Sequence, residues 1–312
     1  MRAAILHGPG DLRVERVPDP QGEVVVAVEA ATTCGTDVKM WRHGHRILGA
    51  YPCAFGHETA GARLDTGERV LVSDSVACGT CLTCQAGRPQ ICRAPTWVLG
   101  GFAELIAAPA AAIHAIPHGL PAPGAAMAEP LAAALHAVDR GGDADDVGIL
   151  GGGTMGLMLA ALLGAEGRTV TLADTHPERR EQATAFGVRA TDRLATHPLV
   201  FEAVGRPGAW LGAIEAGGPG AVVVLVGGCP PGHEVALPAD RVHYEELDLR
   251  GSFHHSRDEV DRALELLVDG TVDWHLLAGE TIGLEDLPRA LASPSGGPAR
   301  KWVVDPRREP GA

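Results

Sequence analysis

A glycine pattern at residues 151–156 constrains the fold more than any other feature of the sequence. It follows an apolar run at 147–150 and opens a second apolar stretch that continues to Ala160. Between a strand and a helix, such glycines permit a tight turn and let the pyrophosphate of a dinucleotide approach the helix N-terminus. The pattern therefore predicts a dinucleotide-binding βαβ unit, with cofactor contacts from Gly151, Gly153, Thr154, Met155 and Gly156.

An acidic residue at the end of the next predicted strand supports this interpretation. Residues 168–174 predict a second strand, which ends in Asp174. In dinucleotide-binding folds, an acid at this place accepts hydrogen bonds from the ribose hydroxyls of adenosine. A carboxylate there repels a 2′-phosphate, so the sequence favours NAD over NADP. Arg179, which we count among the cofactor contacts, and Arg180 follow closely and keep NADP possible.

The second half of the chain continues the alternation of strands and helices. Residues 199–204 and 221–226 are apolar runs typical of buried strands, we expect a further strand at 247–253, and 258–268 has the spacing of an amphipathic helix. This order predicts a doubly wound parallel sheet, an α/β fold. In the first half, short runs at 24–28 and 68–72 predict strands, and we expect β-structure again at 100–105.

A second group of residues has the chemistry of a metal site. Cys34 is followed by Thr36 and Asp37, and His57 and Glu58 come twenty residues later. Thiolate, imidazole and carboxylate are the usual zinc ligands, and a catalytic zinc needs three protein ligands and one open position. Asp37 can hold the other ring nitrogen of His57 and fix its tautomer. With seven cysteines and fourteen histidines in the chain, this grouping by itself is only suggestive.

Four further cysteines lie within fifteen residues, with the spacing C-x2-C-x2-C-x7-C. These are Cys78, Cys81, Cys84 and Cys92. Four thiolates this close match a closed tetrahedral zinc site, which stabilises a lobe too small to have its own core. An iron–sulfur cluster is the alternative, because ferredoxins also use C-x2-C-x2-C, typically closed by Cys-Pro. Here Arg93 follows the last cysteine and no second cluster motif occurs, so we expect structural zinc.

Length and charge set limits on the class of protein. A chain of 312 residues suggests two domains, and a net charge of −13 argues against a nucleic-acid or anionic-membrane partner. The first apolar run breaks after four residues, which predicts a strand and not a secretory signal. No apolar run is long enough for a transmembrane helix. In a chain without a secretory signal, closely spaced cysteines indicate metal ligands in a reducing cytoplasm, where we expect the protein to lie.

Glu129 is the remaining candidate ligand. It precedes Pro130 at the start of an alanine-rich helix that we predict from 126 to about 139. A carboxylate in the first turn of a helix is also favoured by the helix dipole alone. The sequence does not choose between these two roles.

With these motifs in order, the chain resembles the zinc-dependent medium-chain dehydrogenase family over nearly its full length. The resemblance implies a GroES-like β-barrel catalytic domain (1–132 and 256–312, with the cysteine lobe at 78–92) and an inserted Rossmann domain (133–255). It also implies two zinc ions per chain. The catalytic zinc would be bound by Cys34, His57, Glu58 and Glu129, and a glutamate at the last position is similar to the polyol and threonine dehydrogenase branches. Family members are commonly homodimers or homotetramers.

The chain departs from the family pattern at the proton relay. Family members often have a histidine five residues after the first cysteine, where this chain has Lys39. We therefore hypothesise that His43, with His45 as the alternative, carries the proton away after Thr36 accepts it.

The resemblance implies reversible oxidation of a secondary alcohol to a ketone, with hydride transfer to NAD. A polyol, sugar or aminocyclitol suits a zinc site rich in carboxylates. A threonine-type amino-alcohol dehydrogenase and a carbonyl reductase are the alternatives among enzymes. The alternative from another class is a non-catalytic protein that binds zinc and a nucleotide.

Overall fold

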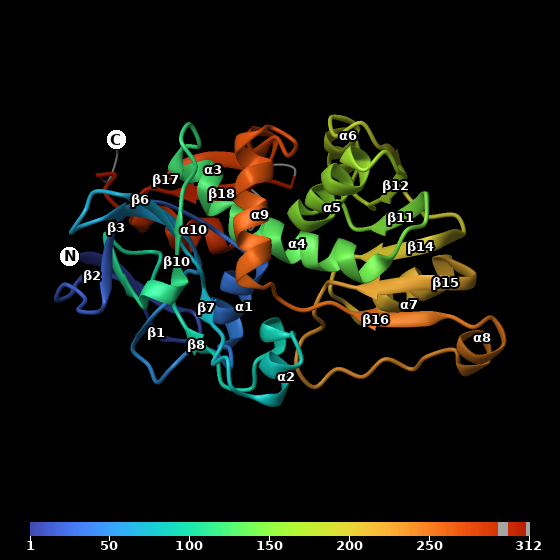
Figure 1. The fold of residues 1–312 in the computed structure, drawn as a ribbon, viewed down its shortest axis with the longest axis horizontal. Coiled ribbons are helices and arrows are strands. Elements are labelled where there is room, and N and C mark those ends of the chain that lie inside the picture. Colours follow the sequence, from blue (N-terminus) through green and yellow to red (C-terminus); the bar gives the residue numbers. More distant parts are fainter. Residues whose placement is uncertain (293–298, 310–312) are drawn as a thin grey trace. The chain divides into compact units, whose positions relative to one another are not determined.

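The computed structural model describes residues 1–292 and 299–309, which form two compact units. Unit 1 comprises Met1–Pro130 and Ser256–Ala312, and unit 2 comprises Leu131–His255. The chain thus leaves the first unit, completes the second and returns. Figure 1 shows the elements of each unit.

Unit 1 is built on a mostly antiparallel sheet that includes strands from both ends of the chain. The strand order is β10-β6-β5-β3-β18-β17, and β9 also pairs with β3. The bounds are β3 (Val24–Thr32), β5 (Glu58–Arg63), β6 (Arg69–Val72), β9 (Leu105–Ala108), β10 (Ile113–Ala115), β17 (Ala278–Ile282) and β18 (Lys301–Val304). Since β18 lies beside β3, the returning segment completes the sheet of the first unit.

Shorter elements surround this sheet. A three-stranded sheet has the order β2-β1-β4, with bounds β1 (Arg2–Gly8), β2 (Asp11–Arg16) and β4 (Cys53–Ala54), and β7 (Ser75–Val76) pairs with β8 (Thr96–Trp97). The helices are α1 (Gly35–His43), α2 (Leu82–Gln85), α3 (Ala122–Ala126), α9 (Arg257–Val268) and α10 (Leu287–Ala292). Helix α4 (Ala128–Gly141) begins in unit 1 and continues into unit 2.

The β-structure expected at 100–105 resumes a few residues later than predicted. Strand β9 begins only at Leu105. Gly100 has a φ of 125°, outside the extended region, and the N–H groups of Gly100 and Gly101 both donate to the carbonyl of Gly56. Gly100 and Gly101 therefore form a turn against the loop that carries His57, and β-structure resumes after them with an isolated bridge between Ala103 and Ala3.

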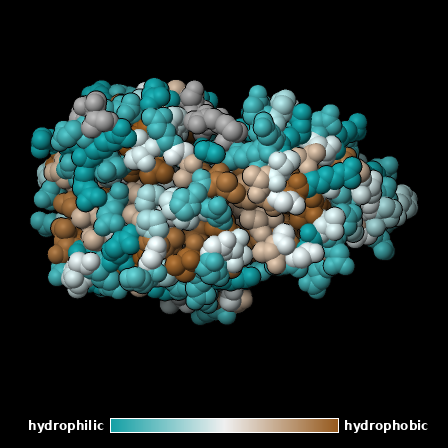
Figure 2. All heavy atoms as spheres, turned by 90° about the horizontal axis from the view of Figure 1, so that it is seen from above, coloured by the Kyte–Doolittle hydropathy of each residue, from teal (hydrophilic) through white to brown (hydrophobic). Residues whose placement is uncertain are grey.

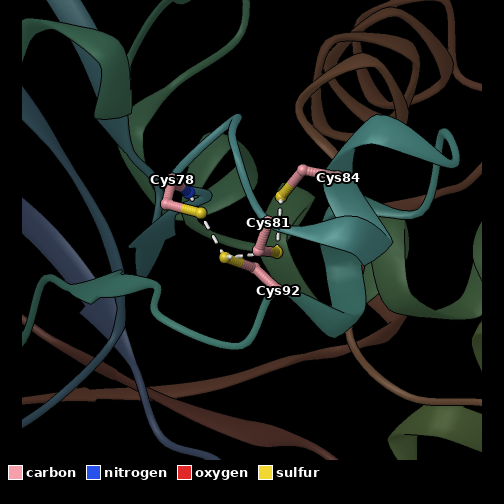
Figure 3. A group of neighbouring side chains, drawn as sticks. All are labelled: Cys78, Cys81, Cys84 and Cys92. Atoms are coloured by element: carbon pink, nitrogen blue, oxygen red, sulfur yellow. Dashed lines mark hydrogen bonds between the residues drawn. The ribbon is translucent and has the colours of Figure 1, made fainter.

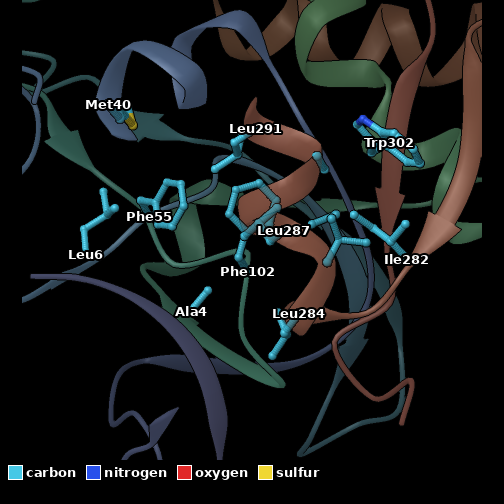
Figure 4. Packing of buried hydrophobic residues seen from close by; sticks show 13 residues of the cluster. Ala4, Leu6, Met40, Phe55, Phe102, Ile282, Leu284, Leu287, Leu291 and Trp302 are labelled. Carbon is cyan, nitrogen blue, oxygen red and sulfur yellow. The ribbon is translucent and has the colours of Figure 1, made fainter. Parts of the chain in front are cut away.

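An apolar core joins the two chain segments of unit 1. The rings of Phe55 and Phe102 meet edge to face with centroids 5.0 Å apart, and Met40 of α1 and Leu291 of α10 pack in the same cluster. Trp302 of β18 belongs to it as well (Figure 4). Burying these side chains fixes α1 and β18, the elements that flank the candidate metal site, against one core.

Unit 2 is a six-stranded, wholly parallel sheet in the order β13-β12-β11-β14-β15-β16. Its strands are β11 (Asp146–Leu150), β12 (Thr169–Ala173), β13 (Arg189–Thr191), β14 (His197–Glu202), β15 (Gly217–Leu225) and β16 (Asp248–Gly251). Its helices are α5 (Thr154–Ala165), α6 (Pro177–Thr184), α7 (Pro207–Ala216) and α8 (Ala239–Tyr244). The order reverses between β11 and β14, and the predicted doubly wound sheet is confirmed.

The surface carries mostly hydrophilic side chains with hydrophobic ones between them, as the face in Figure 2 shows. Among the described residues, no helix combines the length and apolar character that a membrane crossing requires.

The glycine turn of unit 2 leads to a first prediction. A Cβ on Gly156 would lie 1.8 Å from the carbonyl oxygen of Gly151, whereas one on Gly164 of the same helix would meet nothing within 4 Å. We expect Gly156→Ala to lower the free energy of unfolding by about 1–3 kcal/mol and to abolish dinucleotide binding. The matched control Gly164→Ala should gain up to about 1 kcal/mol and bind normally. Thermal melts and calorimetric titration with NAD measure both, and equal binding by the two variants would contradict the assignment of this turn.

Candidate metal and cofactor sites

Cys34 lies where β3 gives way to α1, and the local sequence forms that junction. It is the N-cap of α1, and its Sγ accepts a hydrogen bond from the N–H of Thr36 at 3.5 Å. Asp37, in the first turn, accepts the N–H of Cys34 at 2.8 Å. An acidic side chain that satisfies a free N–H at a helix start stabilises the helix and fixes the preceding residue. The thiol of Cys34 is therefore held in a defined position.

Asp37 also contacts the second candidate ligand. Its Oδ1 lies 3.0 Å from Nδ1 of His57, and the exposed fraction of the Asp37 side chain is 0%. Because an ionised carboxylate only accepts hydrogen bonds, Nδ1 carries a proton, and Nε2 is the ring nitrogen left to bind a metal. One buried carboxylate thus positions both Cys34 and His57.

The third candidate, Glu58, is fixed by the register of the sheet. On β3, Thr32 pairs with Glu58 of β5 on one side and with Val303 of β18 on the other. Lys301 lies two residues before Val303, so its side chain is on the same face as these partners. Accordingly, Nζ of Lys301 donates to Oε1 of Glu58 at 2.7 Å, and the hydroxyl of Thr32 donates to Oε2. All three residues are buried.

The structure brings Cys34, His57 and Glu58 together. One ligand atom from each lies within 4.8 Å of the others. Burial alone would raise the pKa of the Cys34 thiol, but Lys301 and His57 lower it to about 7. Burial alone would lower the pKa of His57, and Asp37 raises it well above its usual value. Without a metal, the pair therefore favours a thiolate on Cys34 beside an imidazolium on His57, and a zinc ion would displace the proton of Nε2 to obtain the thiolate and imidazole donors that it takes.

Glu129 is not part of that close group. It lies at the start of α4 and is largely buried. One of its carboxylate oxygens lies within 4.8 Å of a carboxylate oxygen of Asp74. Burial raises the pKa of Glu58, Lys301 opposes this rise, and the charges of Cys34 and Glu129 add to it. Glu129 is thus close enough to act electrostatically on the group, and its role as a ligand stays a prediction.

The two histidines proposed for the proton relay differ in their surroundings. His43 is exposed in the last turn of α1. His45 is partly buried, and burial together with the positive charges of Arg46, Lys39 and His57 lowers its pKa. Of the two histidines, His45 is the one whose pKa is affected by the charge of His57.

The four cysteines of the lobe at 78–92 form a second group. Their sulfurs point toward one another in Figure 3, with Cys81 Sγ 3.5 Å from that of Cys84 and 3.9 Å from that of Cys92. Sulfurs at the corners of a tetrahedron around one zinc ion are about 3.8 Å apart, given the usual Zn–S bond. An iron–sulfur cube needs its cysteine sulfurs farther apart, so the spacing fits a single ion.

The charges of these thiols agree with that fit. Hydrogen bonds from the Thr83 hydroxyl and from the N–H groups of Arg93 and Cys84 lower the pKa of Cys81 to about 5. Burial and the neighbouring Cys81 raise the pKa of Cys84 to about 12. Four sulfurs this close cannot all ionise unless a cation lies between them.

In unit 2, the predicted cofactor residues gather at the carboxyl end of β11, beside the point where the strand order reverses. Gly151, with a φ of 112°, ends the strand, and Thr154 and Met155 begin α5 as partly exposed residues. Gly153 has open space around it, as an approaching ligand would require. Crevices at such reversals are where doubly wound sheets bind nucleotides.

Asp174 follows β12 at the same edge of the sheet. Its Oδ2 accepts the N–H of Gly152 at 2.8 Å and lies 3.5 Å from Nη1 of Arg179. Burial alone would raise its pKa, but the N–H groups of His176 and Gly152 lower it. The ionised carboxylate of Asp174 is thus hydrogen-bonded to the glycine turn and lies beside the guanidinium of Arg179.

Sequence reasoning missed three polar residues around the metal candidates, namely Lys301, Thr32 and Asp74. A signal for Lys301 was present, because it is one of only two lysines among 26 basic residues. Thr32 and Asp74 have no such signal, since their burial and their neighbours depend on strand pairing.

The sequence is similar to known proteins over nearly its full length. The sequence matches the alcohol dehydrogenase GroES-like domain over residues 20–118 and the zinc-binding dehydrogenase family over residues 151–269. It is 29% identical to L-threonine 3-dehydrogenase of Chelativorans, covering 98% of each chain. It is 28% identical to sorbitol dehydrogenase of Bacillus subtilis, covering 93% of this chain and 92% of the relative.

A solved structure extends the likeness to three dimensions. A zinc-binding dehydrogenase of Sinorhizobium meliloti, bound to NADP, superposes with a TM-score of 0.87 at 27% identity, covering 98% of this chain and 99% of the other. The chain belongs to the zinc-dependent medium-chain dehydrogenase/reductase family. The predicted fold, a GroES-like domain with a Rossmann domain, is confirmed.

The two cysteine-containing groups give a second prediction. We expect the wild-type chain to bind two zinc ions, Cys34→Ser to lose one of them with little change in melting temperature, and Cys81→Ser to lose the other and melt several degrees lower. The control Cys53→Ser, outside both groups, should keep both ions. Zinc content by mass spectrometry and thermal melts measure this. Two ions in Cys34→Ser would exclude Cys34 as a ligand.

Proposed function

We propose that the chain is a zinc-dependent oxidoreductase that reversibly oxidises a secondary alcohol to a ketone and transfers the hydride to NAD. The observation that carries the proposal is that the ligand atoms of Cys34, His57 and Glu58 lie close together. The buried carboxylate of Asp37 is hydrogen-bonded to both Cys34 and His57. A catalytic zinc requires side chains that donate electron pairs, and a histidine ligand whose tautomer is fixed.

The chain's own residues supply the proton chemistry. When bound by Cys34 and His57, zinc supplies positive charge that lowers the pKa of an alcohol at its open position. Thr36 lies two residues after Cys34 at the start of α1, and its hydroxyl would accept the alcohol proton. Asp37 keeps His57 in one tautomer throughout. Glu129 serves as a further ligand or as a nearby charge.

Unit 2 is proposed to hold the nicotinamide cofactor, while unit 1 carries the chemistry. The lowered pKa of Asp174 supports NAD, since an anion there accepts ribose hydroxyls and repels a 2′-phosphate. Arg179, 3.5 Å from Asp174, keeps NADP as a weaker second cofactor.

For the substrate we propose a polyol, sugar or aminocyclitol. The carboxylates of Glu58, Glu129 and Asp74, all buried in unit 1, suit a substrate with several hydroxyl groups. The likeness to a sorbitol dehydrogenase supports this class, and the likeness to a threonine dehydrogenase keeps an amino alcohol as the second candidate. As in the family, we propose a homodimer or homotetramer.

The substrate proposal is tested with zinc-loaded protein, NAD or NADP, and a panel of polyols, sugars, aminocyclitols, L-threonine and simple secondary alcohols. We expect turnover with a polyhydroxylated substrate, at least tenfold better with NAD, measured by nicotinamide absorbance. His57→Ala should bind NAD normally and turn over nothing. A preference for L-threonine would replace the polyol proposal. No turnover with any substrate, in a chain that binds only one zinc ion, would favour the non-catalytic alternative.

The proton relay is tested by two single substitutions. Since His45 is partly buried and the charge of His57 contributes to lowering its pKa, we expect His45→Ala to lower kcat by about a hundredfold, in the usual range for a proton-transfer group. His43→Ala, on the exposed face, serves as the comparison. A loss only in His43→Ala would restore the original hypothesis, and no loss in either would exclude both histidines.

A further inference from the structure

A segment of positive charge follows the first candidate zinc ligand, in a chain whose net charge is −13. Residues 38–57 contain no Asp or Glu, although the chain has 39 of them in 312 residues. The basic residues of this segment are Lys39, Arg42, His43, His45, Arg46 and His57. Positive charge concentrated beside a site in an otherwise acidic protein favours a ligand that carries negative charge.

Helix α1 places the first of these cations beside the proposed proton acceptor. Residues three apart are neighbours on a helix surface, so Lys39 follows Thr36 about 4.5 Å further along the axis. Lys39 is exposed and Thr36 is partly exposed, whereas Asp37 and Met40 of the same helix are buried. A lysine ammonium can therefore reach a ligand that binds next to Thr36.

The second cation, Arg46, lies in the turn that follows α1. This turn is closed by a hydrogen bond of 3.1 Å from the N–H of Leu48 to the carbonyl of His45. The pKa of that imidazole is lowered first by burial and then by the charges of Arg46, Lys39 and His57. Because the effect of a charge falls off with distance, both cations lie near His45, and His45 lies near the candidate ligand His57.

Arg42 has a different environment. Its Nη2 donates to the carbonyl of Ala292 in α10 at 3.1 Å, and its guanidinium carbon lies 5.9 Å from the centroid of the Trp41 ring. Arg42 therefore helps to hold α1 against α10, and it is left out of the group that we assign to a ligand.

We propose that Lys39 and Arg46 bind an anionic group of the substrate, a carboxylate or a phosphate carried by the polyol or sugar whose hydroxyl group is oxidised. The inference rests on the proposed function and narrows its substrate class. An ammonium and a guanidinium both bind such oxyanions through charge-assisted hydrogen bonds. A neutral polyol would not use these two charges, and a cationic aminocyclitol would be repelled by them.

The first test compares substrates that share one carbon skeleton, namely a polyol, the corresponding sugar acid and the corresponding terminal phosphate ester, for several polyols. With zinc-loaded protein and NAD, we expect kcat/KM to be at least tenfold higher for an anionic member than for the neutral polyol. The preference should shrink several-fold between about 0.05 and about 0.5 M salt, because salt screens the charges. The better of the two anionic members identifies the group that is bound.

The outcomes of this comparison separate the inference from the proposed function. Turnover of neutral polyols that equals or exceeds that of their anionic counterparts would overturn the inference and leave the proposed reaction intact. No turnover of any member would instead count against the proposed function.

Substitutions then test the two side chains. Lys39→Gln and Arg46→Gln should each raise KM for the preferred anionic substrate on the order of tenfold, with a smaller change in kcat and none in KM for the neutral polyol. Lys39→Arg should retain most of the binding. The control Arg16→Gln removes an exposed cation on β2, outside the group, and should change neither constant. Equal losses with neutral and anionic substrates would indicate a structural role and contradict the inference.

A binding measurement makes the test independent of turnover. The NMR signal of His45 is assigned by its absence in His45→Ala, and its pKa is followed while inorganic phosphate is added, with sodium chloride of equal ionic strength as the control. A bound anion offsets the charges of Lys39 and Arg46, so phosphate should raise the pKa of His45 in the wild type. The double variant Lys39→Gln with Arg46→Gln should not respond. A wild-type pKa that phosphate changes no more than sodium chloride does would overturn the inference.

Discussion

The pairing of β3 with β5 on one side and with β18 on the other determines the chemistry of unit 1. It places Thr32 between Glu58 and Val303, and it brings Lys301 to the same face of the sheet. A shift of one residue in either register would turn these side chains to the opposite face. The salt bridge between Lys301 and Glu58 joins residues 243 positions apart, so the site cannot form before the C-terminal segment has returned.

Charge balance explains why so many ionisable groups can be buried here. Cys34, Asp37 and Glu58 are acidic, and His57 and Lys301 are their cationic partners. Each carboxylate is hydrogen-bonded on both oxygens, to Cys34 and His57 in one case and to Lys301 and Thr32 in the other. Paired and fully hydrogen-bonded charges tolerate burial, whereas any one alone would not. A bound zinc then adds positive charge to a framework that is already rigid.

The local parts of this organisation could be predicted from the sequence. The glycine turn at 151–156 and the cysteine spacing at 78–92 depend on residues close in the chain, and both are found in the structure. Helix α1 after Cys34 was not predicted. The β-structure expected at 100–105 begins only at Ala103, because Gly100 adopts a positive φ that no apolar pattern reveals. Lys301 and Thr32 were missed because their importance depends on strand register across the whole unit, which a single sequence does not specify.

The most direct test of the central claim is a crystal structure of the zinc-loaded chain with diffraction data measured at the zinc absorption edge. Two anomalous peaks per chain are predicted, one among the four sulfurs of the lobe at 78–92 and one bound by Sγ of Cys34 and Nε2 of His57. A single peak in the cysteine lobe, with Cys34 and His57 bonded only to protein, would contradict the catalytic zinc and the proposed reaction with it.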